Sequence, residues 1–303
     1  MDNLCHTLVG AALGETGLKR RTRFGTLTLA LASNLPDLDV LVFLTPVTPV
    51  SFRRGWTHGP LAQALLPVLL TLVMLAWSRR RPARPGEPPA HAGWLLLFSY
   101  VGVLLHVGMD FLNNYGVRLL MPWSGRWFYG DAVFIVDPWL YLFLGGGWWL
   151  ARRRGVGRPA VAGLLLAVLY VAALVPIART ARARVLEAWT AQAGRPPQAL
   201  MVGPWFGTPF QKQVIVDRGD GYDTGSFSVL SGALTLDGRL DTLPREHPAV
   251  RAALADPRVR AILVWSRFPR FEIQDGPEGR SVLLTDVRFG RLRGAGMAVV
   301  PIP

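Results

Sequence analysis

Cysteine is nearly absent from this chain, and its absence narrows the possible chemistry. Cys5 is the single cysteine among 303 residues, which excludes an internal disulfide and any zinc site built on cysteine. The motif His-Glu-x-x-His is also missing, which disfavours intramembrane zinc proteolysis. Asp2 is the only charge before Glu15, so the N-terminus lacks the basic region of a signal peptide. We therefore expect the first hydrophobic segment to stay in the mature protein.

Nucleic-acid recognition motifs are lacking too, although the net charge is +13. Residues 1–178 hold 16 basic residues, and 12 of them fall in three short clusters. The clusters are Lys19 to Arg23, Arg79 to Arg84 and Arg152 to Arg158. They separate long hydrophobic blocks, which is typical of cytoplasmic loops under the positive-inside rule. The charge therefore indicates membrane topology, and we expect no nucleic-acid partner.

Hydrophobic residues make up 50% of the chain and are unevenly distributed. Up to about residue 178 they form blocks close to the ~20 residues that a membrane-spanning helix needs. These blocks are 24–44, 59–77, 92–109, 132–151 and 159–178, and the shorter segment 3–18 either spans or lies at the interface. The sequence predicts a polytopic α-helical membrane bundle of about five to six spans over residues 1–178. A small α+β, mainly antiparallel-sheet soluble domain is predicted over residues 179–303.

The basic clusters also orient the predicted spans. With all three clusters in the cytoplasm, the loops 45–58 and 115–131 are outside. The span 159–178 then delivers the domain 179–303 to the extracytoplasmic side. Twelve basic residues lie inside and four outside in this topology. We expect a multi-pass protein of the cytoplasmic (inner) membrane.

Acidic residues and histidines are few in the hydrophobic blocks, and their positions are informative. They are His6, Asp37, Asp39, His58, His106, Asp110, Asp131 and Asp137. Ionisable residues in membrane segments are costly to keep and usually functional. Aspartate with histidine is also the ligand set of hydrolytic metal sites. In the predicted topology, four or five independent segments present these residues near their outer ends, at one depth.

The segment Asn34-Leu-Pro-Asp-Leu-Asp39 interrupts an otherwise apolar helix. Proline removes a backbone donor and disfavours helix at the residue before it, so the helix is predicted to kink or restart here. A broken helix at membrane depth is tolerated where it lines a protein or water cavity. Helix capping explains one aspartate, whereas two aspartates in a hydrophobic block favour metal ligation.

The other members of the group have simpler explanations when each is taken alone. His106 and Asp110 are spaced i, i+4 and share a helix face, which also suits a hydrogen bond that holds two helices together. His58 is equally well explained as an interfacial histidine. Asp137 precedes Pro138 and is either a ligand or a plain N-cap. The convergence of the group, rather than any one motif, indicates a metal site.

Taken together, these motifs resemble the membrane-bound metal-dependent hydrolase family typified by bacterial inner-membrane YdjM-like proteins. The resemblance covers most of residues 1–140 in matching order. It rests on the N-terminal His6 helix, Asn34-Leu-Pro-Asp-Leu-Asp39, Arg54-Gly-Trp-Thr-His58 and His106-Val-Gly-Met-Asp110. It also implies a distant similarity to the zinc-dependent phospholipase C and P1-nuclease group, whose helical bundles hold zinc with histidine and aspartate. By this similarity the metal ligands are His6, Asp37, Asp39, His58, His106 and Asp110.

The resemblance implies hydrolysis with one to three divalent ions, and zinc is the expected metal. Such an ion lowers the pKa of a bound water to about 7, and that water then attacks a phosphorus or carbonyl centre. Asp39 or Asp137 is the expected general base. The arginines of the predicted outer loops are Arg53, Arg54, Arg118 and Arg126. Guanidinium groups suit phosphate, although anchoring to lipid headgroups explains these residues equally well. The expected partner is membrane lipid, and the expected substrate is a phosphoester-containing lipid or lipid-linked molecule.

Two other functions use similar residues. A divalent-metal transporter or channel would spread its ligands through the membrane depth, whereas here they cluster toward one side. A non-catalytic scaffold would use the metal only to hold the helices together, with a closed coordination shell and no pocket.

The region after residue 178 contains no recognisable catalytic constellation. A helix is expected over 179–193, and a second, short one over Pro248–Leu254. Strand-like patterns occur at 213–217, 221–230, 261–268 and 281–289, and Asp217-Arg-Gly-Asp220 is predicted to be a turn. Leu283, Val287 and Phe289 would line one face of the last strand.

Overall fold

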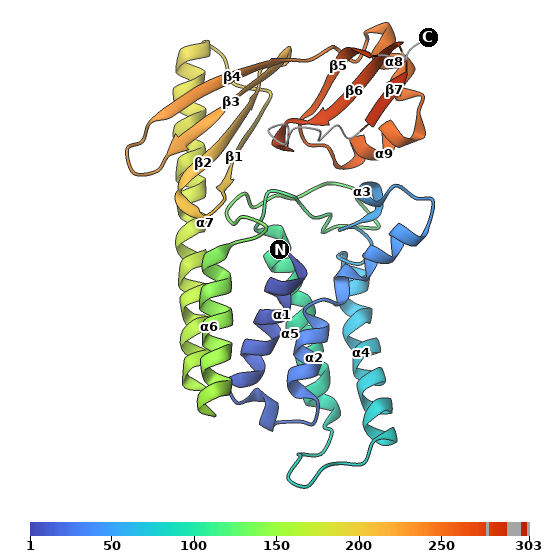
Figure 1. The fold of residues 1–303 in the computed structure, drawn as a ribbon, viewed down its shortest axis with the longest axis vertical. Coiled ribbons are helices and arrows are strands. Elements are labelled where there is room, and N and C mark those ends of the chain that lie inside the picture. Colours follow the sequence, from blue (N-terminus) through green and yellow to red (C-terminus); the bar gives the residue numbers. More distant parts are fainter. Residues whose placement is uncertain (277–278, 290–297, 302–303) are drawn as a thin grey trace. The chain divides into compact units, whose positions relative to one another are not determined.

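Two units make up the computed structural model, which describes residues 1–276, 279–289 and 298–301 (Figure 1). The helical unit comprises Met1–Leu41 and Arg53–Pro176. The sheet unit comprises Ile177–Pro303 together with the segment Val42–Phe52.

The helical unit is built from helices that run up and down beside one another (Figure 1). They are α1 (Asn3–Glu15), η1 (Leu18–Arg20), α2 (Gly25–Ala32), η2 (Leu35–Leu44, as far as Leu41), α4 (Pro60–Arg80), α5 (Ala92–Phe111), α6 (Pro138–Arg154) and α7 (Arg158–Ala193, as far as Pro176). Helix α2 is central, since it packs against α1, α4 and α5, and α1 also packs against α6.

The sequence contains local signals for the starts of these helices. The Asp2 carboxylate caps α1 by accepting hydrogen bonds from the first backbone N–H groups, and the Asp137 carboxylate does the same for α6. Pro60 and Pro138 occupy the first turns of α4 and α6, where a missing N–H costs nothing. Asp137 is therefore a helix cap, which is one of the two roles that its sequence context allows.

Small residues let α1 and α5 approach α2 closely. A Cβ atom on Gly10 of α1 would lie 2.6 Å from the carbonyl oxygen of Leu29 on α2. A Cβ atom on Gly102 of α5 would lie 2.4 Å from the Cβ of Ala32 on the same helix. A larger side chain at either glycine would therefore clash with α2. Close packing of small residues is the usual way in which helices associate within a membrane.

The proline at position 36 breaks a span, as its sequence context predicts. Helix α2 ends at Ala32, and the 3-10 helix η2 begins at Leu35 with its axis bent by 53°. A proline lacks the N–H that would continue the α-helical ladder, and it restricts the residue before it. The bend turns Asp37 and Asp39 away from the direction of α2.

Among the described residues, three helices are long and apolar enough to cross a membrane, namely α4, α5 and α7. The bent pair of α2 and η2 raises the number to four if it counts as one span. Five to six spans were expected. Two segments account for the difference: α1 has 13 residues, and α6 starts only at Pro138 and runs into three arginines at its end.

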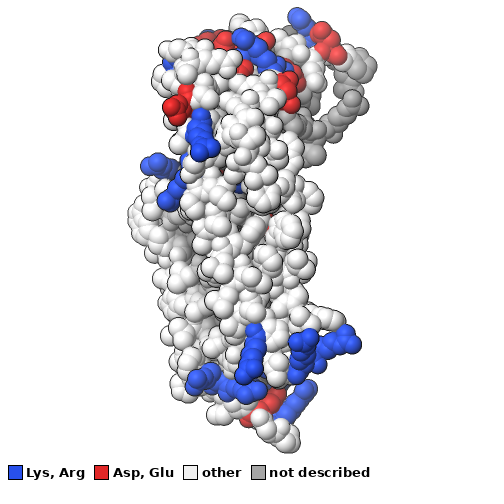
Figure 2. Space-filling view, turned by 90° about the vertical axis from the view of Figure 1, so that its left-hand side faces the viewer, with Lys and Arg blue, Asp and Glu red and all other residues white. Residues whose placement is uncertain are grey.

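The three basic clusters lie in connections that share one end of the helical unit. These connections join α1 to α2, α4 to α5, and α6 to α7 (Figure 1). Figure 2 shows Lys and Arg side chains gathered at that end, beside a helical surface without charged groups. This separation of charge from an apolar surface is the pattern of a membrane protein.

The sheet unit contains two antiparallel sheets. One has the order β1-β2-β3-β4 and the other the order β5-β6-β7. The elements are α3 (Pro49–Phe52), β1 (Ala199–Trp205), β2 (Thr208–Asp217), β3 (Gly221–Ser228), β4 (Leu234–Asp241), α8 (Pro248–Leu254), α9 (Pro257–Trp265), β5 (Pro269–Gly276), β6 (Gly279–Asp286), η3 (Val287–Phe289) and β7 (Ala298–Pro301). Val185 and Trp189, in the last turns of α7, pack on Val202 and Val214 of the first sheet.

Several elements of this unit agree with the prediction from the sequence, and one predicted element is wrong. The short helix Pro248–Leu254 is confirmed, as is the turn after Asp217 that joins β2 to β3. The expected strand 261–268 is wrong, because Pro257–Trp265 is a helix. Val259 and Ile262 of this helix are three positions apart and are buried on one helical face. The residues at its C-terminal end resemble the alternating pattern of a strand, which explains the wrong prediction. The expected strand 281–289 is too long at its end, because β6 ends at Asp286. Val287 and Phe289 lie in the 3-10 helix η3 and not on one strand face with Leu283.

A buried ion pair holds the end of β6. The Asp286 carboxylate accepts hydrogen bonds from the Arg288 guanidinium at 2.8 and 2.9 Å, from the Ser266 hydroxyl at 2.9 Å and from the Arg267 amide at 2.8 Å. Burial by itself would raise the pKa of Asp286, but the charge and hydrogen bonds of Arg288 outweigh it and hold the pKa below its usual value.

We expect the Asp286→Asn variant to lose about 3–5 kcal/mol of folding free energy, because it leaves the Arg288 charge buried and unpaired. The folded pKa of Asp286 is depressed, so the contribution of the pair is complete above about pH 5 and is lost as the pH falls through the folded pKa. Thermal unfolding of the sheet unit between pH 3 and pH 7 measures both effects.

The matched control is Asp275→Asn, which breaks an exposed pair with Arg280. We expect it to cost no more than about 1 kcal/mol. Equal destabilisation by the two variants would contradict the role given to Asp286.

Candidate metal centre

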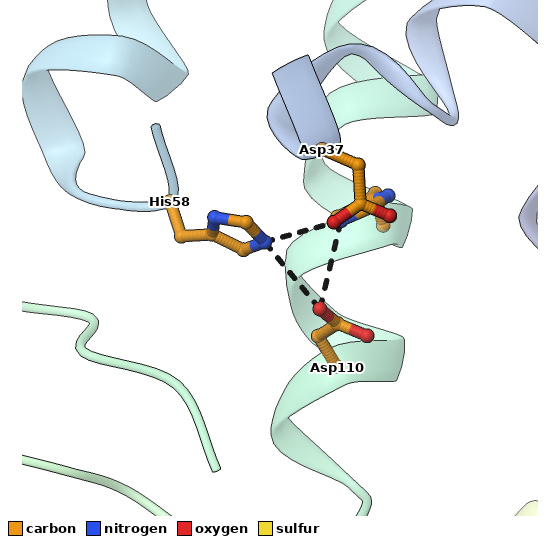
Figure 3. Close-up of side chains that lie close together, drawn as sticks. Asp37, His58 and Asp110 are labelled. Atoms are coloured by element: carbon orange, nitrogen blue, oxygen red, sulfur yellow. Dashed lines mark hydrogen bonds and ion pairs between the residues drawn. The ribbon is translucent and has the colours of Figure 1, made fainter. Parts of the chain in front are cut away.

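Four side chains from three segments of the helical unit meet at one point. They are Asp37 from η2, His58 from the turn before α4, and His106 and Asp110 from α5. Each offers one ligand atom, and these four atoms lie within 4.8 Å of one another. All four residues are buried. Figure 3 shows Asp37, His58 and Asp110 pointing toward a common centre. We call these four residues the ligand cluster.

Local structure explains why these side chains meet. His106 and Asp110 are four residues apart on α5 and share one face of that helix. The bend after α2 brings Asp37 to the same place. His58 is held in a turn, in which its amide donates to the carbonyl of Gly55 at 3.0 Å.

The distances within the ligand cluster match those around a small metal ion. The Nε2 atoms of His58 and His106 are 3.2 Å apart. The Oδ2 atom of Asp110 lies 3.4 Å from the former and 3.6 Å from the latter. Asp37 is slightly more distant, with its Oδ1 atom 4.0 Å from Nε2 of His106. Ligand atoms of a tetrahedral zinc site lie about 3.3 Å apart, given bonds of ~2.0–2.1 Å.

The hydrogen bonds behind the two histidines orient both rings as metal ligands. Nδ1 of His106 donates to the carbonyl oxygen of Ser33 at 2.8 Å. The Thr57 hydroxyl donates to Oδ2 of Asp39 at 3.2 Å, so it accepts the Nδ1–H of His58, which is 3.0 Å away. Each Nδ1 therefore carries the hydrogen, and each Nε2 carries a lone pair. Such partners fix the tautomer of metal-binding histidines.

Two lone pairs that face each other at 3.2 Å cannot form a hydrogen bond with each other. A cation between them removes the conflict. The Oδ2 atom of Asp110 supports this interpretation, because no hydrogen bond from the described residues reaches it. A buried carboxylate oxygen without a donor is costly unless it binds a positive charge. The residues present therefore fit a divalent metal.

His6 lies beside the ligand cluster, although it is not one of the four. Its ring stacks on that of His106, with the centroids 3.8 Å apart, and its Nε2 atom is 3.3 Å from Oδ1 of Asp110. In the described part of the chain, neither ring nitrogen of His6 makes a hydrogen bond. Its role as a ligand stays a prediction.

Asp39 lies behind His58 rather than within the ligand cluster. Its Oδ2 atom accepts the backbone N–H of Arg54 at 2.7 Å and the hydroxyl of Thr57 at 3.2 Å, and it is 3.7 Å from Nδ1 of His58. Its Oδ1 atom accepts from Arg53. These contacts make Asp39 a support for the histidine, and its predicted direct ligation is untested.

Two arginines bring positive charge to the carboxylates. Arg53 donates to Asp37 at 3.3 Å and to Asp39 at 3.2 Å, and its side chain is 27% exposed. Arg54 is buried and donates to Oδ1 of Asp110 at 3.2 Å and to Oδ1 of Asn113 at 3.2 Å. The amino group of Met1 also contacts Asp110. Arg53 is the member of this pair that reaches the surface.

The remaining predicted site residues lie outside the ligand cluster. Arg118 is buried, donates to the carbonyl of Arg53 at 3.2 Å and stacks over Trp127. Arg126 is exposed and lies over Phe128. Asp137 caps α6, and its Oδ2 atom accepts the Tyr170 hydroxyl at 3.1 Å. Their predicted catalytic and substrate-binding roles are untested.

Sequence reasoning missed the groups that support the ligand cluster. Thr57 and the carbonyl of Ser33 orient the histidines, and Asn3 donates to Oδ2 of Asp37 at 2.9 Å. Thr57 precedes His58 in the chain, but nothing in its type or spacing marks it as a partner of that histidine. A backbone carbonyl carries no sequence signal at all.

Comparisons with known proteins identify the family of the chain. The family model described as YdjM inner membrane protein matches residues 1–181, which is more than half of the chain, so the chain belongs to this family. The chain is also 26% identical over 151 residues to a Bacillus subtilis (strain 168) protein described as uncharacterized protein YfhP. That match covers 47% of this chain and 43% of the relative, so the chain spans less than half of that protein's length.

No solved structure matches the chain. The expected distant similarity to the zinc-dependent phospholipase C and P1-nuclease group therefore stays a prediction.

Loss of the ligand cluster should remove bound metal. We expect protein purified in detergent to hold about one equivalent or more of a divalent metal, and His106→Ala and Asp110→Asn to hold none. Elemental analysis measures the content, and gel filtration checks that each variant is folded. The control is His91→Asn, since His91 only caps α5 and asparagine caps helices well. Metal-free wild-type protein that takes up no metal on reconstitution would contradict the site.

The partner of His58 should tune affinity without being a ligand. We expect Thr57→Val to weaken metal binding by about 10- to 100-fold, because the ring of His58 loses the group that fixes its tautomer. Titration with a competing chelator measures the change. The control is Thr71→Val, which removes a buried hydroxyl that donates to the carbonyl of Pro67 on α4. Equal affinities in the two variants would exclude a role for Thr57.

Proposed function

We propose that this member of the YdjM inner membrane protein family is a metal-dependent hydrolase of the cytoplasmic membrane. Its substrate is a lipid or lipid-linked molecule that contains a phosphoester. One observation carries the proposal: two imidazole nitrogens and two carboxylate oxygens lie within 4.8 Å of one another in a buried site. Buried ionisable residues in a membrane protein are a sign of function.

Zinc is the metal that we propose. Two neutral imidazoles and two carboxylates form a nitrogen and oxygen ligand set that zinc accepts, and the short distances between the ligand atoms suit its small tetrahedral shell. When bound, such an ion supplies Lewis acidity and lowers the pKa of a coordinated water to about 7.

The residues in and around the ligand cluster have different roles in the proposed reaction. His58 and His106 would hold the ion through Nε2, since their rings are fixed by Thr57 and Ser33. Asp39 is the better placed of the two predicted catalytic carboxylates, because Thr57 connects it to His58. We propose that Asp39 positions the ring of His58 through Thr57, and its predicted role as the general base stays a prediction. Asp137 is already engaged as the cap of α6.

Arg53 supports a phosphoester as the reacting group. It contacts both Asp37 and Asp39, and it is partly exposed, so its guanidinium lies between the carboxylates of the site and the surface. A planar guanidinium donates well to phosphate oxygens. The buried Arg54 donates to Asp110 and is less accessible to a substrate.

The charges of the protein support a proposal for its sidedness. Clustered basic residues lie at one end of the helical unit, and the positive-inside rule favours the cytoplasm for such an end. The C-terminal ends of α1 and α6 point to that end, and the C-terminal end of α5, with Asp110, points to the other. We propose that the metal centre serves the outer face, that the sheet unit is extracytoplasmic, and that the short helices α1 and α6 also cross, which makes five to six spans.

Hydrolysis should depend on the metal and on Arg53. We expect purified protein in vesicles that contain phosphatidic acid or phosphatidylglycerol to release a water-soluble product. We expect metal removal or Asp110→Asn to abolish the release, and zinc to restore it to the stripped wild-type protein. Arg53→Met should lower kcat/KM by about 100-fold if the guanidinium binds the phosphoester. Mass spectrometry of the products and a phosphate assay measure turnover.

The control for Arg53 is Arg80→Met, which removes an exposed arginine in the last turn of α4, outside the ligand cluster. Full turnover by metal-stripped protein would overturn the proposal. If the metal is tightly bound but no phosphoester lipid is hydrolysed, the ion has only a structural role and holds the helices together.

A further inference from the structure

An apolar groove runs along the helical unit next to the metal centre. It has a volume of about 580 Å³ and lies between α1, α5, α6 and the first part of α7. Its walls include Val9, Leu104, Gly108, Leu140 and Leu164, and nearly all of its lining is aliphatic. A volume of this size is within the range of ~300–1,000 Å³ that is typical of ligand pockets. We call it the chain groove.

The medium around the chain groove is hydrocarbon if the helices span the membrane. Helices α5 and α7, which supply two of its walls, are both long and apolar enough to cross. Water would gain no hydrogen bonds in such a lining, whereas a hydrocarbon chain fits it by shape and polarity. The occupant that suits the chain groove is therefore the chain of a lipid.

The chain groove adjoins the metal centre through Met1. Met109 and Leu112 of its lining flank Asp110 on α5, and Met1, which also lines it, contacts the carboxylate of Asp110. From there it extends down α5 to Leu104, which is about 12 Å at ~1.5 Å per residue. That distance is well within the ~30 Å thickness of a bilayer core.

Gly108 leaves part of the chain groove open. It lies on α5 and lines the groove, and a Cβ atom added to it would meet no atom within 4 Å. Other glycines of this bundle, such as Gly10 and Gly102, are explained by helices that touch them. Gly108 has no such neighbour among the described residues. The space beside it is available to a ligand.

We propose that the chain groove binds one hydrocarbon chain of the substrate lipid and places its phosphoester at the metal centre. This inference rests on the proposed hydrolase function. The chain lies along α5, and the headgroup lies beside Asp110, which Met1 of the groove lining contacts. Binding energy from the non-reacting chain then holds the reacting group in place. The enzyme accordingly prefers chain-bearing phosphoesters over soluble ones.

The decisive experiment fills the chain groove without touching the ligand cluster. The variant is Gly108→Leu, whose side chain enters the open space. The control is Gly146→Leu on α6, where an added Cβ atom also meets nothing within 4 Å but which lies outside the groove lining. Both variants should keep the wild-type metal content, which elemental analysis checks.

The readout is binding of a photoactivatable phosphatidic acid with a diazirine in the middle of one acyl chain. In wild-type protein in nanodiscs, we expect crosslinks to peptides of α5 and α7 that line the chain groove. Gly108→Leu should reduce these crosslinks by about tenfold or more, and Gly146→Leu should leave them unchanged. Unlabelled phosphatidic acid and a polyprenyl phosphate, as competitors, distinguish an acyl chain from an isoprenoid chain. Glycerol phosphate, which has no chain, should not compete.

The outcomes separate this inference from the proposed function. Crosslinks that Gly108→Leu does not reduce, or that lie outside the groove lining, overturn the inference, even if wild-type protein hydrolyses the lipid. Crosslinks that are lost only in Gly108→Leu support the chain groove as a lipid site, even if no hydrolysis is found and the proposed function fails. Equal hydrolysis of glycerol phosphate and phosphatidic acid would also overturn the stated preference for a chain.

Discussion

The structure of the helical unit depends on the cost of burying charged groups in an apolar bundle. The carboxylates of Asp37 and Asp110 are buried beside His58 and His106. An ionised carboxylate in such surroundings is strongly destabilising unless it is paired. Arg53 and Arg54 supply part of the compensation, and a cation at the histidine nitrogens would supply the rest. The ligand cluster thus contains the groups that could bind a metal, and the same groups need a nearby positive charge to be stable when buried.

The rest of the bundle can be understood as the means of bringing these groups together. A break at Pro36 turns one aspartate toward α5, and the close approach at Gly102 sets α5 against α2. Ser33, at the end of α2, offers a carbonyl group that is no longer needed within the helix, and His106 binds it. The break therefore supplies both a ligand and the hydrogen bond that orients another ligand.

Polar and apolar features meet at Asp110. Arg53 and the carboxylates suit a phosphoester, and the chain groove that begins beside Asp110 suits a hydrocarbon chain. A lipid that bears a phosphoester carries both groups in one molecule. Metal binding alone would also suit a scaffold, whereas an adjoining groove with an open glycine is a feature that a scaffold does not need.

The sequence by itself determined which residues are available for chemistry and roughly where the membrane helices lie. Hydrophobic length and charge clusters are local properties, and the helix break and the i, i+4 pair follow from residue types alone. Only the tertiary structure decided which of six candidate ligands share one centre, because that depends on how α2, α4 and α5 pack. It set Asp39 behind His58, made Asp137 a helix cap and buried Arg54. It also folded Pro257–Trp265 as a helix, since the burial of one helical face outweighs a short run that resembles a strand.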